Sequence, residues 1–136
     1  MYGNPAFECA GATLHAVCRQ LATVVTVDGV IDEINLDRLT ALALRFVIPE
    51  KPYILDLSHV ESFATHAVSL LSAIDERCYH RDVEWALIAG EPVRRALQNC
   101  TMTFPLADSV PDAMHEFAER LEERRRLLPL LTKKTA

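Results

Sequence analysis

Short runs of β-branched and aliphatic residues alternate along the chain with longer stretches in which apolar residues recur every three or four positions. Residues 13–18 and 23–27 form the first two runs, and they predict a hairpin or two adjacent strands. Asn35 is the predicted N-cap of a following helix, and Pro49 is the residue that ends it. The apolar face of this helix consists of Leu36, Leu39, Leu42, Ala43 and Phe46.

The middle of the chain repeats this alternation. Residues 53–57 have the length and apolar content of a central strand, and the polar stretch 58–63 predicts a connection. Residues 83–89 predict another strand, and residues 93–100 predict a short helix. Between the strands predicted at 53–57 and 83–89, a helix is predicted to start at Thr65. Its apolar stripe is formed by Ala67, Val68, Leu70, Leu71, Ile74 and Cys78.

The last part of the chain predicts an edge strand and a long helix. Residues 104–106 form the candidate edge strand, and Ser109 with Asp112 resembles a capping box that opens a final amphipathic helix. The predicted order of elements is therefore ββαβαβαβα. This alternation favours an α/β fold in which a mixed β-sheet carries its helices mainly on one side.

Size and charge limit the classes of function. The 136 residues are 50% hydrophobic, which suffices for one core. We expect a domain at residues 13–128, an N-terminal extension at 1–12 and a C-terminal tail at 129–136. The net charge of -5 argues against direct nucleic-acid binding, because affinity for a polyphosphate rests on clustered Lys and Arg. A protein or small-molecule partner is expected, and the oligomeric state stays open.

The sequence predicts neither membrane insertion nor cofactor chemistry. The N-terminus lacks the pattern of a secretory signal, and no stretch approaches the roughly 18 apolar residues of a membrane span, so a cytoplasmic protein is expected. No phosphate-binding glycine motif appears, and no cofactor or metal is expected. The cysteines are widely spaced, which predicts reduced and mostly structural thiols at Cys9, Cys18, Cys78 and Cys100.

Four segments resemble, in order and at matching separations, the motifs of the STAS (sulfate transporter and anti-sigma factor antagonist) family. They are a strand followed by Gly-x-hydrophobic-Asp, a hydrophobic-Asp-Leu-Ser-x-Val strand, the opening of the second helix, and a strand followed by Gly-x-x-x-Val-Arg-x-x-Leu. In this chain they lie at residues 24–32, 53–60, 63–71 and 87–97. The resemblance implies a STAS-like fold.

Stand-alone members of this family at this size are typically bacterial anti-sigma factor antagonists, which act in transcription regulation and signalling. The resemblance implies a protein-binding module that binds a kinase-like anti-sigma factor and thereby releases a sigma factor. It implies that phosphorylation at Thr65, at the start of the second helix, switches the interaction. The implied partner-binding residues are Glu61, Ser62, Ala64, Thr65, His66 and Ser69.

Other interpretations stay open. Thr65 is also a candidate helix N-cap whose hydroxyl accepts a backbone N–H. The family's Asp-Ser pair reads Ala64-Thr65 here, and its glycine position is Ala67, which fits a degenerate domain that binds a partner or ligand constitutively without phosphorylation. A small enzyme is the further alternative, although Asp32 and Asp56 fit structural roles better than catalytic ones. No catalytic residue is therefore predicted.

Overall fold

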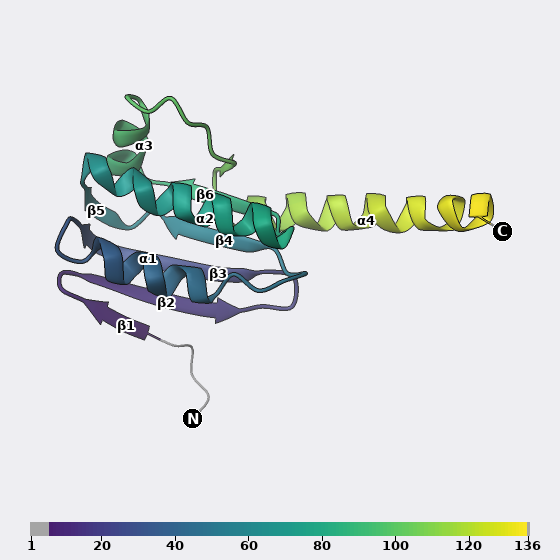
Figure 1. The fold of residues 1–136 in the computed structure, drawn as a ribbon, viewed down its shortest axis with the longest axis horizontal. Helices are drawn as coiled ribbons and strands as arrows, with labels where there is room; N and C mark the ends of the chain where they lie inside the picture. The colour runs from purple at the N-terminus through teal and green to yellow at the C-terminus, as the bar shows by residue number, and fades with distance from the viewer. Residues whose placement is uncertain (1–5, 136) are drawn as a thin grey trace.

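The computed structural model describes the backbone of residues 6–135 and the side chains of residues 6–127, and its strands and helices alternate around one mixed sheet (Figure 1). The strands are β1 (Ala6–Cys9), β2 (Ala12–Cys18), β3 (Thr23–Ile31), β4 (Tyr53–Leu57), β5 (Val60–Phe63), β6 (Trp85–Ala89) and β7 (Leu106–Ala107). The helices are α1 (Leu36–Arg45), the 3-10 turn η1 (Thr65–Ala67), α2 (Val68–Arg81), α3 (Glu91–Leu97) and α4 (Val110–Thr135).

The sheet has the strand order β1-β2-β3-β4-β6-β7. Strands β1, β2 and β3 pair in antiparallel fashion, whereas β3, β4, β6 and β7 run parallel. β5 pairs with the end of β3, beyond the point where β4 stops. The carboxyl ends of the central parallel strands therefore meet at one end of the molecule, beside β5 and α3 (Figure 1).

The two faces of the sheet carry different amounts of apolar packing. The larger core lies under α1 and α2, where Leu39, Leu55 and Ile74 are fully buried. A smaller cluster lies on the other face and includes Ile54, Ala86 and the α4 side chains Ala113 and Phe117. β6 is buried along its whole length, as expected for a central strand covered on both faces.

The predicted fold class is confirmed, and the structure adds two short strands to the predicted order. β1 forms within the predicted N-terminal extension, of which residues 1–5 lie outside the described part, and pairs with β2. The prediction of a plain connection at 58–63 is wrong, because residues 60–63 form β5. A four-residue edge strand has too few alternating positions to stand out from a polar loop.

Several helix ends also differ from the prediction. α1 ends at Arg45, four residues before Pro49, and α3 spans Glu91–Leu97 rather than 93–100. The edge strand predicted near 104–106 is present as β7. At the end of the chain, α4 runs through Thr135, so the helix includes most of the residues assigned to the tail. In the described part of the chain, no helix has the length and apolarity needed to cross a bilayer.

Asn35 occupies the predicted N-cap position of α1, but its side chain does not cap the helix. It is buried, and its Nδ2 donates hydrogen bonds to the carbonyl oxygens of Cys9, Ala10 and Val30 at 3.0, 3.2 and 2.7 Å. Its Oδ1 accepts a hydrogen bond from the Asp32 N–H at 3.0 Å. Asn35 therefore ties the β1–β2 turn to the end of β3, a long-range role that the sequence does not reveal.

Candidate functional site

A groove of about 340 Å³ lies at the end of the molecule where the central parallel strands stop. One wall comes from β5 and η1, and the other comes from α3, which packs directly against β5. The lining residues are Glu61, Ser62, Phe63, Thr65, Pro92, Arg95, Ala96 and Asn99. A crevice outside the carboxyl ends of parallel strands is the usual place for a binding site in α/β folds.

The β4–β5 turn and the β6–α3 turn approach each other closely at the same end of the sheet as this groove. The Asp56 carboxylate accepts hydrogen bonds from the Ser58 N–H at 3.0 Å and from the Ser58 hydroxyl at 2.6 Å, which fixes the first turn. At the second turn, a Cβ on Gly90 would lie 2.9 Å from the Ser58 carbonyl oxygen. Only glycine permits this approach, so Gly90 sets how near α3 comes to β5.

Thr65 is the first residue of η1, and its side chain is exposed at the groove. The prediction that its hydroxyl caps a helix is wrong, because Ala64 holds the N-cap position of η1 and no side chain caps either η1 or α2. The turn is instead closed by the backbone, where the Ala67 N–H donates to the Ala64 carbonyl at 2.9 Å. The Thr65 hydroxyl is therefore free of a structural helix-capping role.

The six residues expected to bind a partner share one short segment but do not all line the groove. Glu61, Ser62 and Thr65 line it. His66 and Ser69 are exposed beside it on η1 and α2, and Ala64 is half-buried against the core. Their role in partner binding stays a prediction, and the geometry divides the set into groove residues and flanking residues.

Sequence reasoning missed the wall that α3 contributes. Arg95 lies on this wall, and its guanidinium pairs with Glu91 one turn earlier at 2.6 Å, with both side chains largely exposed. Arg95 is the basic residue and Glu61 the acidic one among the groove's lining side chains. The available signal was the alternation of strand and helix patterns across residues 53–100, which favours parallel strands whose following segments lie at the same end of the sheet, as the register of β4 and β6 shows.

The acidic residues considered for chemistry have structural roles. Asp32 accepts hydrogen bonds through Oδ1 from the N–H groups of Ile34 and Asn35, so it forms the turn before α1. Asp56 fixes the β4–β5 turn, as described above. Among the residues whose side chains are described, no three or more His, Cys, Asp and Glu side chains come together as metal ligands.

Cys78 is buried on the inner face of α2, as its place in the apolar stripe predicts. Burial raises the pKa of its thiol to about 12, the Asp75 carboxylate adds to this rise, and Arg77 opposes it. The pKa of Tyr53 is also raised well above 10, mainly because the ring is buried. These groups lie in the core, away from the groove, and the protonated forms that burial favours suit packing rather than acid–base chemistry.

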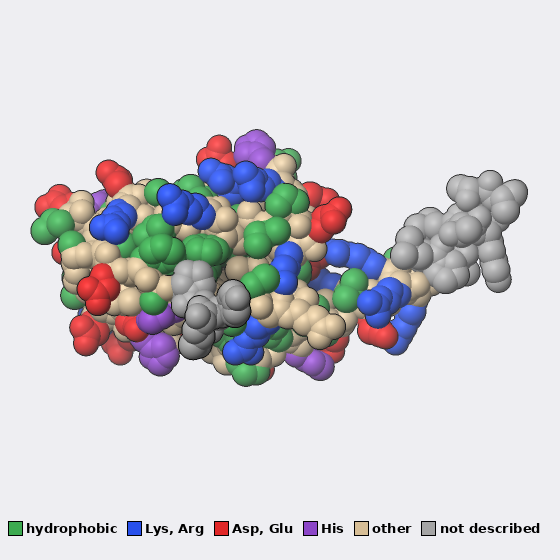
Figure 2. Space-filling view, turned by 90° about the horizontal axis from the view of Figure 1, so that it is seen from below, with side chains coloured by type: hydrophobic (Ala, Val, Ile, Leu, Met, Phe, Trp, Pro, Cys, Tyr) green, Lys and Arg blue, Asp and Glu red, His purple; other side chains and the backbone are tan. Residues whose placement is uncertain are grey.

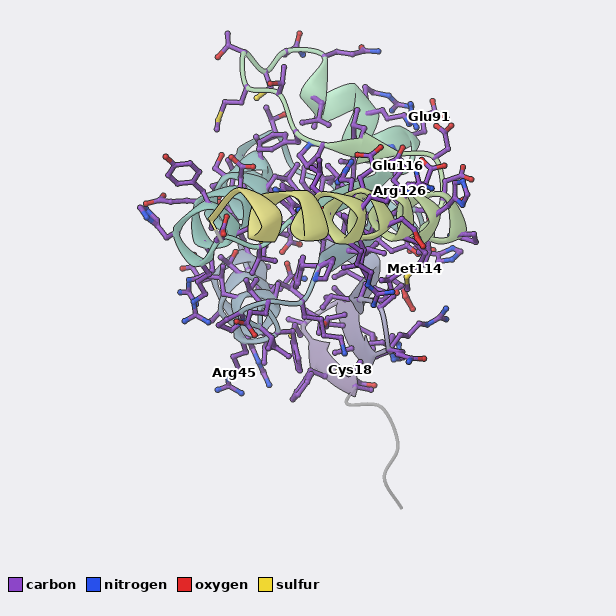
Figure 3. The ribbon with its side chains drawn as sticks, turned by 90° about the vertical axis from the view of Figure 1, so that its right-hand side faces the viewer. Cys18, Arg45, Glu91, Met114, Glu116 and Arg126 are labelled. Atoms are coloured by element: carbon purple, nitrogen blue, oxygen red, sulfur yellow. The ribbon has the colours of Figure 1, made fainter. Side chains whose placement is uncertain are left out.

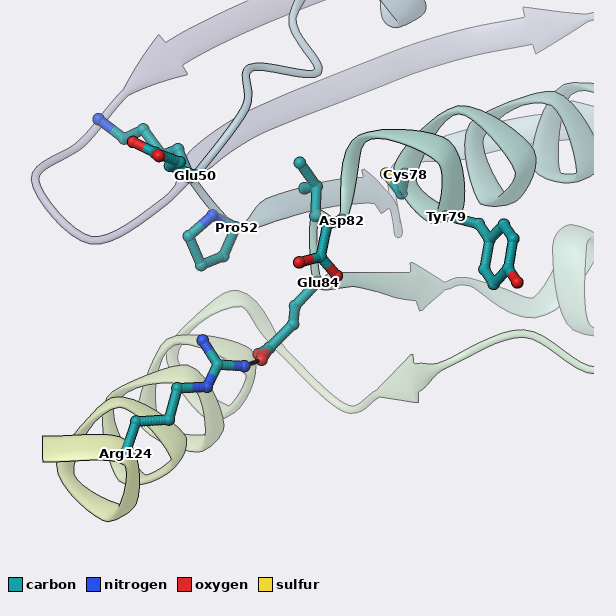
Figure 4. Close-up of a pocket in the computed structure, with 9 residues that line it drawn as sticks. Glu50, Pro52, Cys78, Tyr79, Asp82, Glu84 and Arg124 are labelled. Atoms are coloured by element: carbon teal, nitrogen blue, oxygen red, sulfur yellow. Dashed lines mark ion pairs between the residues drawn. The ribbon is translucent and has the colours of Figure 1, made fainter. Parts of the chain in front are cut away.

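A second concave region lies at the opposite end of the sheet, where α4 leaves the domain. A cavity of about 370 Å³ there has Glu50, Cys78, Tyr79 and Asp82 among its lining residues. Figure 4 shows Arg124 of α4 reaching across to Glu84, with which it forms an ion pair. This polar cavity is bordered by the helix that projects from the domain, so it differs in setting from the groove beside Thr65.

The arrangement of strands and helices has a counterpart among known proteins. The sequence pattern that defines the STAS domain matches residues 13–113. The chain belongs to the STAS domain family. All four segments that carried the resemblance, at residues 24–32, 53–60, 63–71 and 87–97, lie inside the matched region. The groove is thus formed within the STAS domain itself.

Relatives of this STAS domain include proteins with assigned names. Osmosensory protein A of Mycobacterium tuberculosis is 38% identical over 138 residues, which cover 96% of this chain and 87% of that protein. An anti-sigma factor antagonist from Mycobacterium paratuberculosis superposes with a TM-score of 0.68 at 25% identity, covering 79% of this chain and 94% of that one. RsbS of Moorella thermoacetica shares the fold with a TM-score of 0.68 at 13% identity, and the superposition covers 80% of this chain and 97% of that one.

Proposed function

We propose that this STAS domain is an anti-sigma factor antagonist that binds a kinase-type anti-sigma factor and thereby releases a sigma factor. In this proposal it is a regulatory binding module and not an enzyme. The observation that carries the proposal is the groove between β5, η1 and α3 in a domain that resembles a named antagonist over 94% of that protein. The partner face consists of Glu61, Ser62, Ala64, Thr65, His66 and Ser69, together with the α3 wall.

The composition of this face suits a protein partner. Glu61 and Arg95 supply one charge of each sign, and Ser62, Thr65 and Asn99 supply neutral hydrogen-bonding groups. Phe63 adds apolar surface at the base of the groove. Charges of opposite sign at the rim of a contact fix the register of the partner more than they add affinity.

Phosphorylation at Thr65 would switch this face. The hydroxyl is exposed and has no capping role, so it is accessible to a kinase. A phosphate adds close to two negative charges at pH 7, in a groove whose basic lining residue, Arg95, already pairs with Glu91. The added charge near Glu61 would weaken a contact shaped for the neutral threonine.

A capture experiment tests the proposed function. The tagged chain, its Thr65→Glu variant and an Ala41→Glu control are used to capture proteins from the cytosol of the source cells, followed by mass spectrometry. Ala41 is exposed on α1, outside the partner face, so the control adds the same charge elsewhere. A kinase-like anti-sigma factor captured by wild type and control but lost from Thr65→Glu is expected. Its absence from all three samples would overturn the proposal.

A second candidate is constitutive binding without phosphorylation. It is favoured by Ala64, which replaces the carboxylate that precedes the phosphorylated residue in the family pattern. It is also favoured by Ala67, which is fully buried in the core and places a Cβ where the family has glycine. Incubation of the chain with its captured partner and ATP separates the two candidates: phosphate on Thr65 supports the switch, and an unmodified chain in a stable complex supports constitutive binding.

A further inference from the structure

The apolar stripe of α4 continues past the point where the sheet covers it. Ala113 and Phe117 are buried against the second face of the sheet. Further along the same helix, Leu121 and Leu127 are 38% and 55% exposed. The sequence continues with further leucines at helical spacing from Leu121, namely Leu128 and Leu131. The sequence of the helix beyond the domain is thus amphipathic, and its leucines whose side chains the structure describes, Leu121 and Leu127, are exposed.

Figure 1 shows this part of α4 projecting from the domain as a single helix. From Leu121 to Thr135 it is about 21 Å long at 1.5 Å per residue. An isolated helix of this length is marginal in water, and Pro129 inside it has no N–H to donate to the preceding turn. Such a projection gains stability from a neighbour that covers its apolar side.

Charge is segregated along α4. Residues 116–123 contain four glutamates and one arginine, whereas residues 124–135 contain three arginines, two lysines and no acidic residue. Figure 2 shows Lys and Arg side chains gathered where the helix leaves the body of the protein. Two copies of this helix in antiparallel contact would place each acidic half beside the basic half of the other. A parallel pair would instead place like charges side by side.

A concave surface lies at the base of the projection. A groove of about 440 Å³ is lined there by residues that include Leu21, Ile48, Phe117 and Leu121, with Ile48 40% exposed. Its charged lining residues are balanced, with Glu50 and Glu84 beside Lys51 and Arg124. Figure 3 faces this end of the molecule, with Cys18 at the end of β2 and Arg126 on α4. The leucines of a second helix end match the apolar part of this groove.

We propose that two copies of this chain pair through α4 in antiparallel orientation, with the end of each helix lying over the groove at the base of the other. The contact is isologous, because the same surface is used on both copies. This inference goes beyond the proposed anti-sigma factor antagonism. The pairing surface lies at the end of the sheet opposite β5 and α3 (Figure 1), so each copy keeps its partner face free.

Sedimentation equilibrium of the full chain tests the pairing. The chain has a mass of 15.2 kDa, and a twofold symmetric pair of about 30 kDa is expected at tens of micromolar protein. Leu127→Glu places a charge on the exposed stripe and is expected to give a monomer with an unchanged circular dichroism signal from the sheet. A wild-type chain that stays monomeric at these concentrations would overturn the proposal.

Charge reversal tests the antiparallel arrangement. In Glu122→Lys/Glu123→Lys all charged side chains of residues 121–135 are basic, and in Arg125→Glu/Arg126→Glu residues 122–126 contain four glutamates and one arginine. Each variant alone is expected to be monomeric, and an equimolar mixture is expected to form a heterodimer. Arg38→Glu/Arg45→Glu on exposed positions of α1 makes the same charge change away from α4 and is expected to leave the wild-type dimer intact.

Two outcomes would contradict this arrangement. Charge-reversed variants that dimerise as well as wild type would show that α4 does not form the contact. A monomeric wild-type chain that co-sediments with phosphatidylserine vesicles, but not with phosphatidylcholine vesicles, would show that the basic helix end serves an anionic membrane instead of a second copy.

Discussion

The Glu84 carboxylate, just before β6, accepts a hydrogen bond from Arg120 of α4, with Oε2 and Nη1 3.1 Å apart. Arg124, one turn further along α4, pairs with the other oxygen of the same carboxylate (Figure 4). Arg120 also lies over the Phe117 ring, 5.6 Å from its centroid. One half-buried acid therefore holds two successive turns of α4 and sets the direction in which the helix leaves the domain.

Glu84→Gln removes the charge but keeps the shape of this contact. We expect the free energy of unfolding to fall by about 0.5–1 kcal/mol at low salt and by less at high salt, because exposed arginines contribute modest, screened energies. Urea unfolding at two salt concentrations measures the change. Glu76→Gln, whose partner His80 is an exposed neighbour on α2, is the control and should leave stability unchanged. Equal effects of the two substitutions would contradict a special role for Glu84.

Asn35→Asp tests the buried hydrogen bonds through which the Asn35 side chain joins the β1–β2 turn to β3. The substitution is nearly isosteric, but it replaces an amide that donates to three carbonyl oxygens with a group that repels them when ionised. We expect a loss of about 3 kcal/mol or more, since the one donor named above, the Asp32 N–H, does not offset the burial of a charge beside three carbonyl oxygens. Thermal unfolding measures it, with the exposed Asn99→Asp as the control. A fall in the free energy of unfolding below about 0.5 kcal/mol would show that these hydrogen bonds do not hold the turn to β3.

Substitution of two glycines with positive φ distinguishes the stability cost of backbone strain from that of a steric clash. Gly29 has φ +95°, and a Cβ there would lie 2.3 Å from the Gly11 carbonyl oxygen. Gly11 has φ +105°, but its Cβ would meet only the Val30 Cβ, at 4.0 Å. We expect Gly11→Ala to cost about 1 kcal/mol from backbone strain and Gly29→Ala to cost clearly more. Denaturant midpoints compare the two, and equal losses would exclude the clash.

The raised pKa of the Cys78 thiol makes the free energy of unfolding depend on pH in the alkaline range. Its pKa in the folded chain is raised from 9.0 to about 12, so folding favours the protonated thiol. The corresponding stability is present below pH 9 and is lost as the pH rises towards 12. We expect the free energy of unfolding to fall over this range, and less steeply in Cys78→Ala. The buried Tyr53 contributes a decline of the same sign above pH 10, which both proteins share.

Thiol labelling gives an independent check of the same burial. Cys18 is exposed at the end of β2, with the Lys51 ammonium 3.0 Å from its Sγ, whereas Cys78 is 1% exposed. At pH 8 an alkylating reagent should therefore modify Cys18 in the native protein and reach Cys78 only after unfolding. Mass spectrometry of the labelled peptides measures both rates, and comparable native rates at the two thiols would contradict the burial of Cys78.

The sequence predicted the parts of the fold whose pattern is local. The amphipathic stripe of α2 and the apolar run of β4 depend on neighbouring positions only, and both are present. β5 and the role of Asn35 could not be predicted in this way, because each depends on pairing partners distant in the chain, namely β3 for the strand and Cys9 for the amide. A periodic pattern contains no information on such partners.

The candidate site was predicted only on one side, for the same reason. The segment around Thr65 was assigned the partner-binding residues, whereas Arg95 on α3 and Asn99 just after it become part of the site only when β4 and β6 pair in parallel register. The Thr65 capping hypothesis failed because a threonine before an apolar stripe fits both a cap and an exposed first residue of a turn. Only the three-dimensional position of the hydroxyl separates the two.

The central claim is that the groove beside Thr65 binds the anti-sigma factor. Isothermal titration of the captured anti-sigma factor into wild type, Thr65→Glu and the Ala41→Glu control tests it most directly. We predict that Thr65→Glu weakens binding at least tenfold, about 1.4 kcal/mol, while Ala41→Glu binds like wild type. Equal affinity of wild type and Thr65→Glu would contradict the claim and place the partner face elsewhere on the domain.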